Sequence, residues 1–325
     1  MTMIAKMRAA AITSIVAGLF LAAGATAARA QEPPPGRGGG AGRGAGGQRG
    51  GAPGAGGQQN AAQMIVPIKP GLYMVTGAGA NTMVRVTDEG ILVVDAKQIG
   101  PMNYENLMAQ IRTVSDKPVK FVVIGDVHQD KSGNTAQFVE AGAKVIAHVN
   151  EKKGLETYTN PAGKPGAPNV TYEKDYSIKL GGKEVARVYH FGAASTGGDS
   201  ITYFPDLKVV TMGDVFQAGM NCDYAQGGSM VEWPKTLASV LKLDIETVIP
   251  NRGEPTTKAE LQAAQQRVAK IAATAIDLIK KGTPKEQIVE KINAVDPTLM
   301  VDRFLAINPA ARLDAFYDEF VKAAK

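Results

Sequence analysis

The chain has only one cysteine, Cys222, among its 325 residues, so no intrachain disulfide can form. Its stability must come from a hydrophobic core, and without an activating neighbour Cys222 is expected to be a small packed residue. After residue 30 there is no apolar run long enough to cross a bilayer. A charge surplus is missing too: the net +5 comes from residues 1–62, and residues 63–325 are formally neutral. This neutrality gives no electrostatic reason for a nucleic-acid partner.

The first 30 residues have the organisation of a secretory signal peptide. Lys6 and Arg8 precede an apolar run from Ala9 to Ala27, and Ala28-Arg29-Ala30 provides a small-x-small cleavage site. An uncleaved anchor is the alternative, but the run is short and alanine-rich for a membrane span. We therefore expect an exported protein, periplasmic or secreted, that has no stable membrane insertion after cleavage.

Residues 31–62 have the composition of a flexible tether. Thirteen of these 32 residues are glycine, so the segment cannot bury enough apolar surface to offset the entropy of ordering it. An Arg-Gly tail that binds nucleic acid is the alternative, but the aromatic residues that stack on bases are lacking. Residues 63–325 remain, and they are numerous enough for a single large domain.

In residues 63–325, β-rich stretches alternate with helices in two comparable halves. Short runs of apolar and β-branched residues predict strands, and apolar residues spaced by three or four predict helices. This pattern suggests two packed sheets with helices outside, followed by a C-terminal helical tail. The predicted strands are 71–75, 81–87, 91–95, 119–124, 143–147, 176–180, 184–190, 200–204, 209–212 and 247–249, and the predicted helices are 104–114, 135–141, 233–241 and 258–279.

Four loops that follow predicted strands carry polar residues: 126–131, 193–199, 213–214 and 251–253. In order, spacing and flanking sequence they resemble the metallo-β-lactamase superfamily. The hallmark of that family is a His-x-His-x-Asp-His loop with later histidine, aspartate and histidine ligands. The resemblance covers roughly residues 71–255 and includes Asp95 at the end of an early strand. It implies an α+β fold, the αββα sandwich with two mixed sheets between outer helices.

Position by position, the resemblance places three family ligands in this chain. His128 matches the second histidine of the first loop, Asp130 matches its aspartate, and Asp214 matches the aspartate that bridges two metal ions. The other four ligand positions differ, because Asp126, Lys131, Ser195 and Arg252 each replace a histidine. Lysine and arginine offer no lone pair to a metal ion. We therefore expect no two-zinc centre.

The remaining donors leave two alternatives for a cofactor. Asp126, His128 and Asp214 form a set that can hold one divalent ion, as facial sites do for iron or manganese. Without a metal, the three aspartates of the pocket face Lys131 and Arg252, so the charges nearly cancel. We expect the metal-free pocket, with no cofactor, and keep one divalent ion as the alternative.

Ser195 and Asp130 are the candidate catalytic residues. A nucleophilic Ser195 needs a base, and His128 is the only candidate in the motif. Its Ala-Ser-Thr-Gly-Gly setting lacks the Gly-x-Ser-x-Gly elbow and is more typical of a turn. Asp130 would be the base of a one-metal hydrolase. His148 and His190 are expected to be surface or strand-end residues.

The leading functional hypothesis is a non-hydrolytic protein whose cleft binds a small anion, such as a carboxylate or phosphate ester. Its expected ligand contacts are Lys131, Ser195 and Arg252. One alternative is a single-metal hydrolase of esters, thioesters or lactams, and another is a structural partner of an intact relative. Loss of Arg252 is expected to destabilise more than loss of Arg85, which we place on an exposed strand face.

Overall fold

The computed structural model describes residues 61–158, 163–216, 221–299, 301 and 309–325. The predicted signal peptide and residues 31–60 of the predicted tether lie outside the described residues. The described residues belong to one unit that runs from Gly50 to Lys325, so the domain boundary at residue 63 stays a prediction. None of the helices in this described part is both long and apolar enough to cross a membrane.

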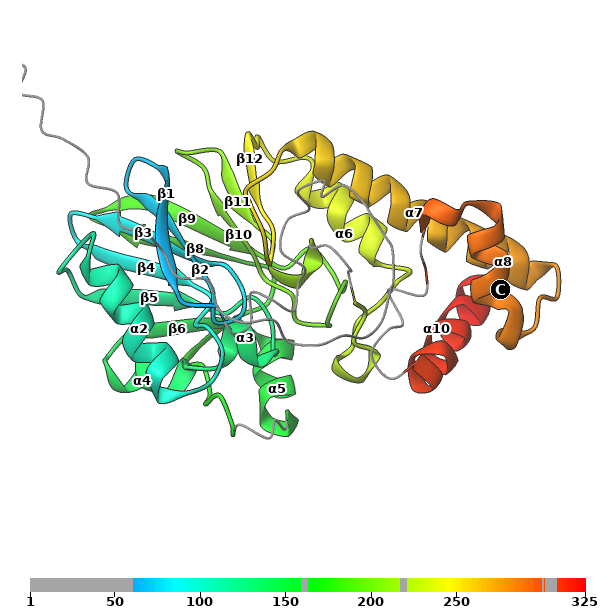
Figure 1. The fold of residues 1–325 in the computed structure, drawn as a ribbon, viewed down its shortest axis with the longest axis horizontal. Helices are drawn as coiled ribbons and strands as arrows, with labels where there is room; N and C mark the ends of the chain where they lie inside the picture. The colour runs from blue at the N-terminus through cyan, green and yellow to red at the C-terminus, as the bar shows by residue number, and fades with distance from the viewer. Residues whose placement is uncertain (1–60, 159–162, 217–220, 300, 302–308) are drawn as a thin grey trace, which may run out of the picture. The chain divides into compact units, whose positions relative to one another are not determined.

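The first sheet contains seven strands in the order of the chain (Figure 1). The first four pair antiparallel, and the fourth to the seventh pair parallel. Because parallel neighbours point the same way, their carboxyl ends meet at one edge of the sheet. The strands are β1 (Met64–Lys69), β2 (Leu72–Thr76), β3 (Thr82–Thr87), β4 (Gly90–Val94), β5 (Val119–Val123), β6 (Lys144–His148) and β7 (Val170–Tyr172).

The second sheet has five strands in the order β12-β11-β10-β9-β8, of which β11 and β12 are parallel. The other neighbouring pairs are antiparallel. The strands are β8 (Asp175–Leu180), β9 (Lys183–Tyr189), β10 (Ile201–Phe204), β11 (Val209–Thr211) and β12 (Thr247–Ile249).

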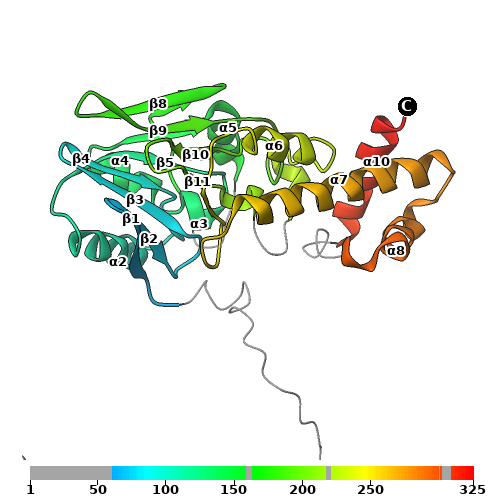
Figure 2. The same cartoon turned by 90° about the horizontal axis from the view of Figure 1, so that it is seen from above.

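Alternation of buried side chains along the strands builds the layers. In β4, Leu92 and Val94 pack into the cluster between the two sheets, whereas Ile91 and Val93 pack against the helices outside the first sheet. Side chains of a strand point alternately to opposite faces, so a strand that is apolar throughout is buried on both. Two mixed sheets lie between helices, as Figure 2 shows, which confirms the predicted sandwich.

The helices that cover the first sheet and its loops are α2 (Pro101–Arg112), α3 (Gln129–Ser132), α4 (Thr135–Glu140) and α5 (Val149–Thr157). Those on the second sheet and beyond it are α6 (Trp233–Val240), α7 (Lys258–Lys280), α8 (Lys285–Val295) and α10 (Pro309–Ala323). The described residues also contain the 3₁₀ turns η1 (Gly213–Val215), η2 (Tyr224–Gln226) and η3 (Pro297–Leu299). The sequence did not predict β1, β7, α3 or α5.

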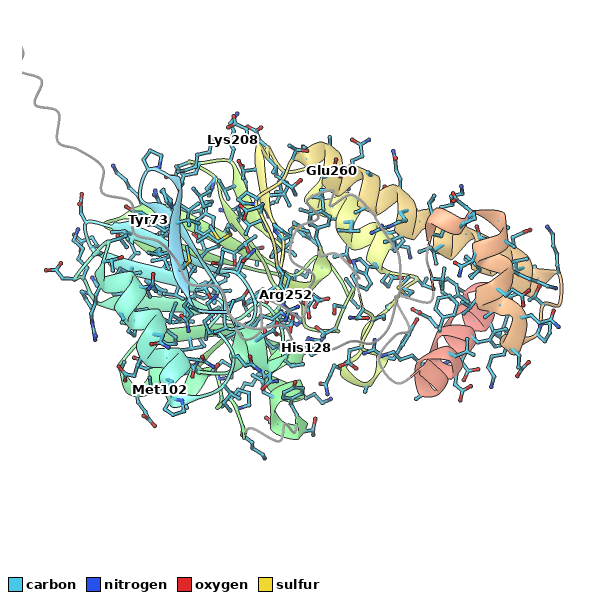
Figure 3. The ribbon with its side chains drawn as sticks, viewed as in Figure 1. Tyr73, Met102, His128, Lys208, Arg252 and Glu260 are labelled. Atoms are coloured by element: carbon cyan, nitrogen blue, oxygen red, sulfur yellow. The ribbon has the colours of Figure 1, made fainter. Side chains whose placement is uncertain are left out.

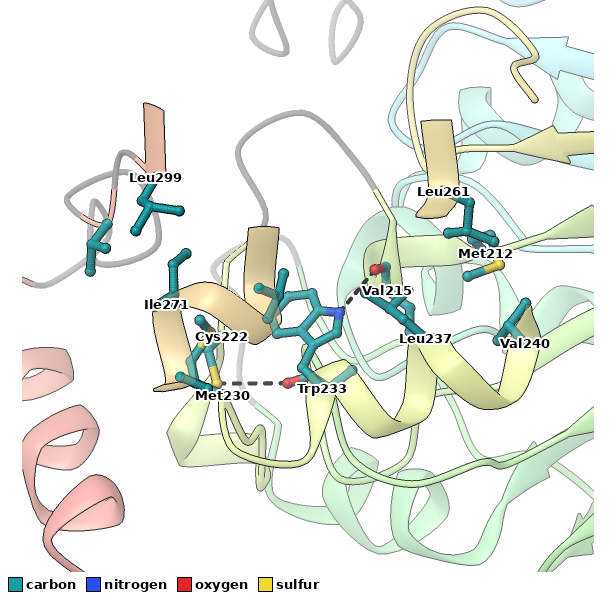
Figure 4. Packing of buried hydrophobic residues seen from close by; sticks show 14 of the residues in the cluster. Met212, Val215, Cys222, Met230, Trp233, Leu237, Val240, Leu261, Ile271 and Leu299 are labelled. Atoms are coloured by element: carbon teal, nitrogen blue, oxygen red, sulfur yellow. Dashed lines mark hydrogen bonds between the residues drawn. The ribbon is translucent and has the colours of Figure 1, made fainter. Parts of the chain in front are cut away.

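The largest aromatic side chain, Trp233, lies at the centre of the cluster that joins the second sheet to α6 and α7 (Figure 4). Its indole N–H donates to the Val215 carbonyl at 3.0 Å, which satisfies the one polar atom of a fully buried ring. Cys222 is fully buried in the same cluster, as expected.

The expected exposure of Arg85 is wrong. Its side chain is 13% exposed, because Asp206 in the β10–β11 turn lies 2.6 Å from the guanidinium and Pro70 accepts a second hydrogen bond. The two remaining histidines, His148 and His190, lie at strand ends, as expected, and His148 is buried. Its ring stacks on that of His190 with centroids 3.8 Å apart.

Candidate functional site

The loops that follow β5, β11 and β12 meet at one edge of the sandwich and bring the motif residues together. Asp126 follows β5, Asp214 lies in η1 directly after β11, and Arg252 follows β12. Figure 3 shows His128 and Arg252 near each other at this edge. Gly213 has a φ of 49°, a conformation that L side chains rarely adopt, and it lets the chain turn just before Asp214.

The ammonium group of Lys131 is the centre of the cluster. Its Nζ lies 2.8 Å from an oxygen of Asp214, 2.9 Å from Asp130 and 3.5 Å from Asp126, and the side chain is 1% exposed. Burial alone would lower the pKa of this lysine, but the three carboxylates outweigh that effect and raise it well above its usual value. Lys131 is therefore a permanent cation inside the site.

Arg252 supplies a second cation, and its guanidinium pairs with Asp130. The loop that carries it is held from another strand. The side-chain amide of Asn81 donates to the carbonyls of Pro250 at 3.0 Å and Gly253 at 2.9 Å. The arginine is 16% exposed, so it reaches solvent, whereas Lys131 does not.

His128 lies between carboxylates on both sides of its ring. Nδ1 is 2.9 Å from Asp126 and 3.0 Å from Asp214, without hydrogen-bond geometry, and Nε2 is 3.1 Å from Asp223. Burial disfavours the charged ring, but the three carboxylates dominate and raise the pKa of His128 well above its usual value. The ring is an imidazolium whose Nε2–H donates to Asp223. Its side chain is 24% exposed.

Ser195 lies beside this cluster but is not placed for nucleophilic attack. Its hydroxyl donates to the Asn221 carbonyl at 2.9 Å, and its own carbonyl accepts from the Asp223 amide at 2.7 Å. Among the described residues no hydrogen bond joins Ser195 to His128. Its surroundings are those of a turn residue, and only 1% of it is exposed.

Behind the cluster lie buried acids that the sequence analysis missed or left without a role. Burial raises the pKa of Asp95 and of Asp199 to about 8. Burial and the nearby Asp126 raise that of Glu151 well above its usual value. Neither carboxyl oxygen of Glu151 has a hydrogen-bond partner among the described residues. Glu151 is therefore a neutral acid at neutral pH, and no sequence motif marks it.

Lys97 is a second fully buried lysine that sequence reasoning missed. Its ammonium donates to the carbonyls of Val75 at 2.7 Å and Ala80 at 2.6 Å, so it holds the β2–β3 turn over the site. Burial lowers the pKa of Lys97 to about 7. Its position two residues after Asp95, at the end of a buried strand, was the only available signal.

Comparisons with known proteins agree with this architecture, although no family model matches the chain. Metallo-beta-lactamase IND-1 of Chryseobacterium indologenes is 26% identical over 185 residues, which are 53% of this chain and 73% of that protein. A metallo-beta-lactamase from Pontibacter korlensis superposes with a TM-score of 0.55 at 21% identity, over 64% of this chain and 99% of that chain.

A third protein, FIM-1 from Pseudomonas aeruginosa, was solved in a mono-zinc form. It superposes with a TM-score of 0.56 at 14% identity, over 65% of this chain and 97% of that chain. The chain has the metallo-β-lactamase fold and is similar in sequence to a member of that superfamily. The superposition with the Pontibacter protein leaves about a third of this chain unmatched. Residues 1–60 are less than a fifth of the chain, so some of the described residues are unmatched as well.

The second metal position of the superfamily does not suit an ion here. Of its family ligands only Asp130 and Asp214 remain, and Lys131 lies within 2.9 Å of both. Arg252 pairs with Asp130 as well. An ammonium group thus takes up the carboxylate oxygens that an ion at this second position would need.

The first position fits one ion better. Asp126, His128 and Asp214 offer ligand atoms that all lie within 4.8 Å of one another. Among the described residues, Nδ1 of His128 and Oδ2 of Asp126 are buried without a hydrogen-bond partner. Lys131 disfavours an ion at this position, because its ammonium already neutralises Asp214.

Proposed function

We propose that this protein is a metallo-β-lactamase-fold protein that binds a small anion and lacks two-zinc hydrolysis. The observation that carries the proposal is the contact between Nε2 of His128 and Asp223 at 3.1 Å. On the solvent side of the site, the protein's own carboxylate Asp223 is bound by His128, whose charged form is favoured by the carboxylates around it. A carboxylate is thus the kind of group that this position recognises.

Lys131 accounts for the change in chemistry. Its charge neutralises the carboxylates that would otherwise hold metal, but an ammonium cannot acidify a water molecule as zinc does. Lys131 and Ser195 are each 1% exposed, so neither faces solvent. In the proposal, the groups that contact the ligand are therefore His128 and Arg252, which do reach solvent.

The place of action is part of the proposal. The signal-like first 30 residues support export to the periplasm or medium, and the glycine-rich residues 31–62 would then act as a tether. Sequencing the N-terminus of the protein recovered from the producing cells tests export. A mature N-terminus near residue 31 supports it, and an intact Met1 contradicts it.

The anion function is tested by titrating chelator-treated protein with inorganic phosphate and with succinate, measured by calorimetry. Arg252→Gln should weaken binding at least about tenfold, because a charge-assisted hydrogen bond contributes roughly 1.5–3 kcal/mol. Lys235→Gln is the matched control, since Lys235 is 69% exposed and pairs with Glu232. If neither the parent nor Asp223→Asn binds either anion, the proposed function is wrong.

A single divalent ion is the second candidate, favoured by Nδ1 of His128 and Oδ2 of Asp126, which are buried without a hydrogen-bond partner among the described residues. Asp126, His128 and Asp214 would hold the ion, which would polarise an ester, thioester or lactam carbonyl. Asp130 is the candidate base. Elemental analysis of protein purified without chelator separates the two functions, because a stoichiometric metal favours the hydrolase.

A further inference from the structure

The C-terminal helix α10 contacts the loop that carries Asp223, almost a hundred residues earlier in the chain. Glu319 makes this contact, and its carboxylate accepts hydrogen bonds from four donors of one loop. The donors are the hydroxyls of Tyr224 (2.9 Å) and Ser229 and the amides of Met230 (3.1 Å) and Val231 (3.3 Å).

The start of the same loop is held from the same helix. A guanidinium nitrogen of Arg312 lies 3.5 Å from the side-chain oxygen of Asn221, whose carbonyl accepts from Ser195. Phe316 and Phe320, on the buried face of α10, pack into the Trp233 cluster. The apolar face thus packs the helix onto the core, and its polar residues Arg312 and Glu319 hold the loop 221–231 at both ends.

Within the loop, Asp223 is rigidly placed. Its backbone carbonyl accepts from the amides of Gln226 at 3.0 Å and Gly228 at 2.9 Å, and its Oδ1 accepts from Ala225 at 3.1 Å. Its other oxygen remains for His128. If the carboxylate leaves the imidazolium while the turn stays in place, it also loses the Ala225 amide, so the turn favours the contact with His128, and the turn is attached to α10.

We propose that α10 regulates access to the anion site, and that Glu319 is the positioning residue that keeps Asp223 on His128. Asp223 then competes with an external anion for the imidazolium. The identity of the ligand rests on the proposed function. The coupling of α10 to the loop does not depend on that function. Any event that draws α10 away raises the affinity of the site.

The size of the effect follows from the fraction of molecules in which Asp223 has left His128. Apparent affinity falls in proportion to that fraction, because only the open form binds ligand. If the loop is open in roughly one molecule in ten or fewer, release raises affinity about tenfold or more. Asp223 is part of the same chain, so it competes at an effective concentration of roughly millimolar or higher. It therefore excludes weakly binding external anions more than tightly binding ones.

Cys222 offers a readout of loop position that needs no ligand. It is the only cysteine of the chain, it is fully buried, and it is the neighbour of Asp223. In Glu319→Ala, we expect an aromatic disulfide reagent to label Cys222 at least about tenfold faster than in the parent. Asp318→Ala is the control, because Asp318 is exposed on the same helix and should leave the rate unchanged.

Two further measurements guard against loss of folding. The free energy of unfolding of each variant shows whether labelling exceeds what global unfolding allows. If Glu319→Ala does not fold, Tyr224→Phe removes one of the four donors with little change in shape and should give a smaller acceleration. Unchanged labelling in a folded Glu319→Ala or Tyr224→Phe protein overturns the positioning role.

Phosphate affinity tests whether Asp223 is the competitor. Asp223→Asn and Glu319→Ala should each bind phosphate about tenfold more tightly than the parent, and the double variant no more tightly than Asp223→Asn alone. Equal gains from Glu319→Ala with and without Asp223 overturn the inference. If labelling of Cys222 accelerates in Glu319→Ala but no variant binds phosphate, both the anion function and the regulation of access are wrong. That result would leave Glu319 only the role of positioning the loop.

Discussion

Replacing Lys131 with methionine tests the reasoning about the site most directly. The substitution keeps much of the apolar stem and removes one charge from among three carboxylates. At an effective dielectric constant of about 20, each of its contacts at 2.8–3.5 Å represents roughly 5 kcal/mol of gross attraction. Burial of the charges offsets most of this attraction, and removing one partner of a buried group costs about 3–5 kcal/mol. We expect Lys131→Met to lose that amount of unfolding free energy.

Denaturant unfolding of chelator-treated protein measures the loss. In thermal unfolding each kcal/mol corresponds to roughly 2–4 °C for a domain of this size. Lys235→Met is the matched control, because that lysine is 69% exposed and should give little change. A loss in Lys131→Met as small as in the control would show that its ammonium does not hold the carboxylates.

Zinc provides the second half of this test. Without the ammonium, Asp126, His128 and Asp214 can hold a divalent ion, so zinc should stabilise Lys131→Met. A ligand at a hundred times its dissociation constant adds about 2.7 kcal/mol. The parent should gain nothing from micromolar zinc. A parent that gains as much as the variant would mean that the lysine does not occupy a metal position, and the metal-free interpretation would be wrong.

Three further outcomes are expected. Arg252→Ala should lose about 2–4 kcal/mol of unfolding free energy, less than Lys131→Met because the guanidinium is partly exposed. The control Lys281→Ala should change little, and equally small losses in both variants would place Arg252 in solvent. The folded state holds a proton on Glu151 that the unfolded chain releases above about pH 4.5, so the free energy of unfolding falls as pH rises. Glu151→Gln should make this fall less steep, by at most about 1.4 kcal/mol per pH unit. An unchanged pH slope in denaturation curves of the variant would refute the prediction. The four ligand histidines are restored by Asp126→His, Lys131→His, Ser195→His and Arg252→His. The variant with all four changes should bind about two zinc ions by elemental analysis and hydrolyse a generic ester or lactam, whereas single reversions should not.

Local patterns in the sequence were sufficient for the fold, and the motif residues at the strand ends were recognisable as well. The apolar run 119–124 was recognisable as a buried strand, and the loop 126–131 after it kept the spacing of a metal-binding motif. The resemblance to the metallo-β-lactamase superfamily identified Asp214 and Arg252, which alone would be an ordinary turn aspartate and a loop arginine. Elements with few apolar residues or little length, such as β7 and α5, gave no comparable signal, since their stability comes from packing on neighbours.

Tertiary structure decided what the motif residues do. In sequence Lys131 is only a cation beside an aspartate, but the fold surrounds its ammonium with three carboxylates and removes it from solvent. Asp223, Glu151 and Glu319 lie in segments with no recognisable pattern and gain roles only through contacts with residues tens of positions away. Charge, burial and hydrogen bonding depend on distances that chain folding sets, whereas spacing and periodicity report only neighbours along the chain. The sequence by itself therefore determined the sandwich and the loops that meet at its edge, and only the tertiary structure determined which charges meet there and which of them reach solvent.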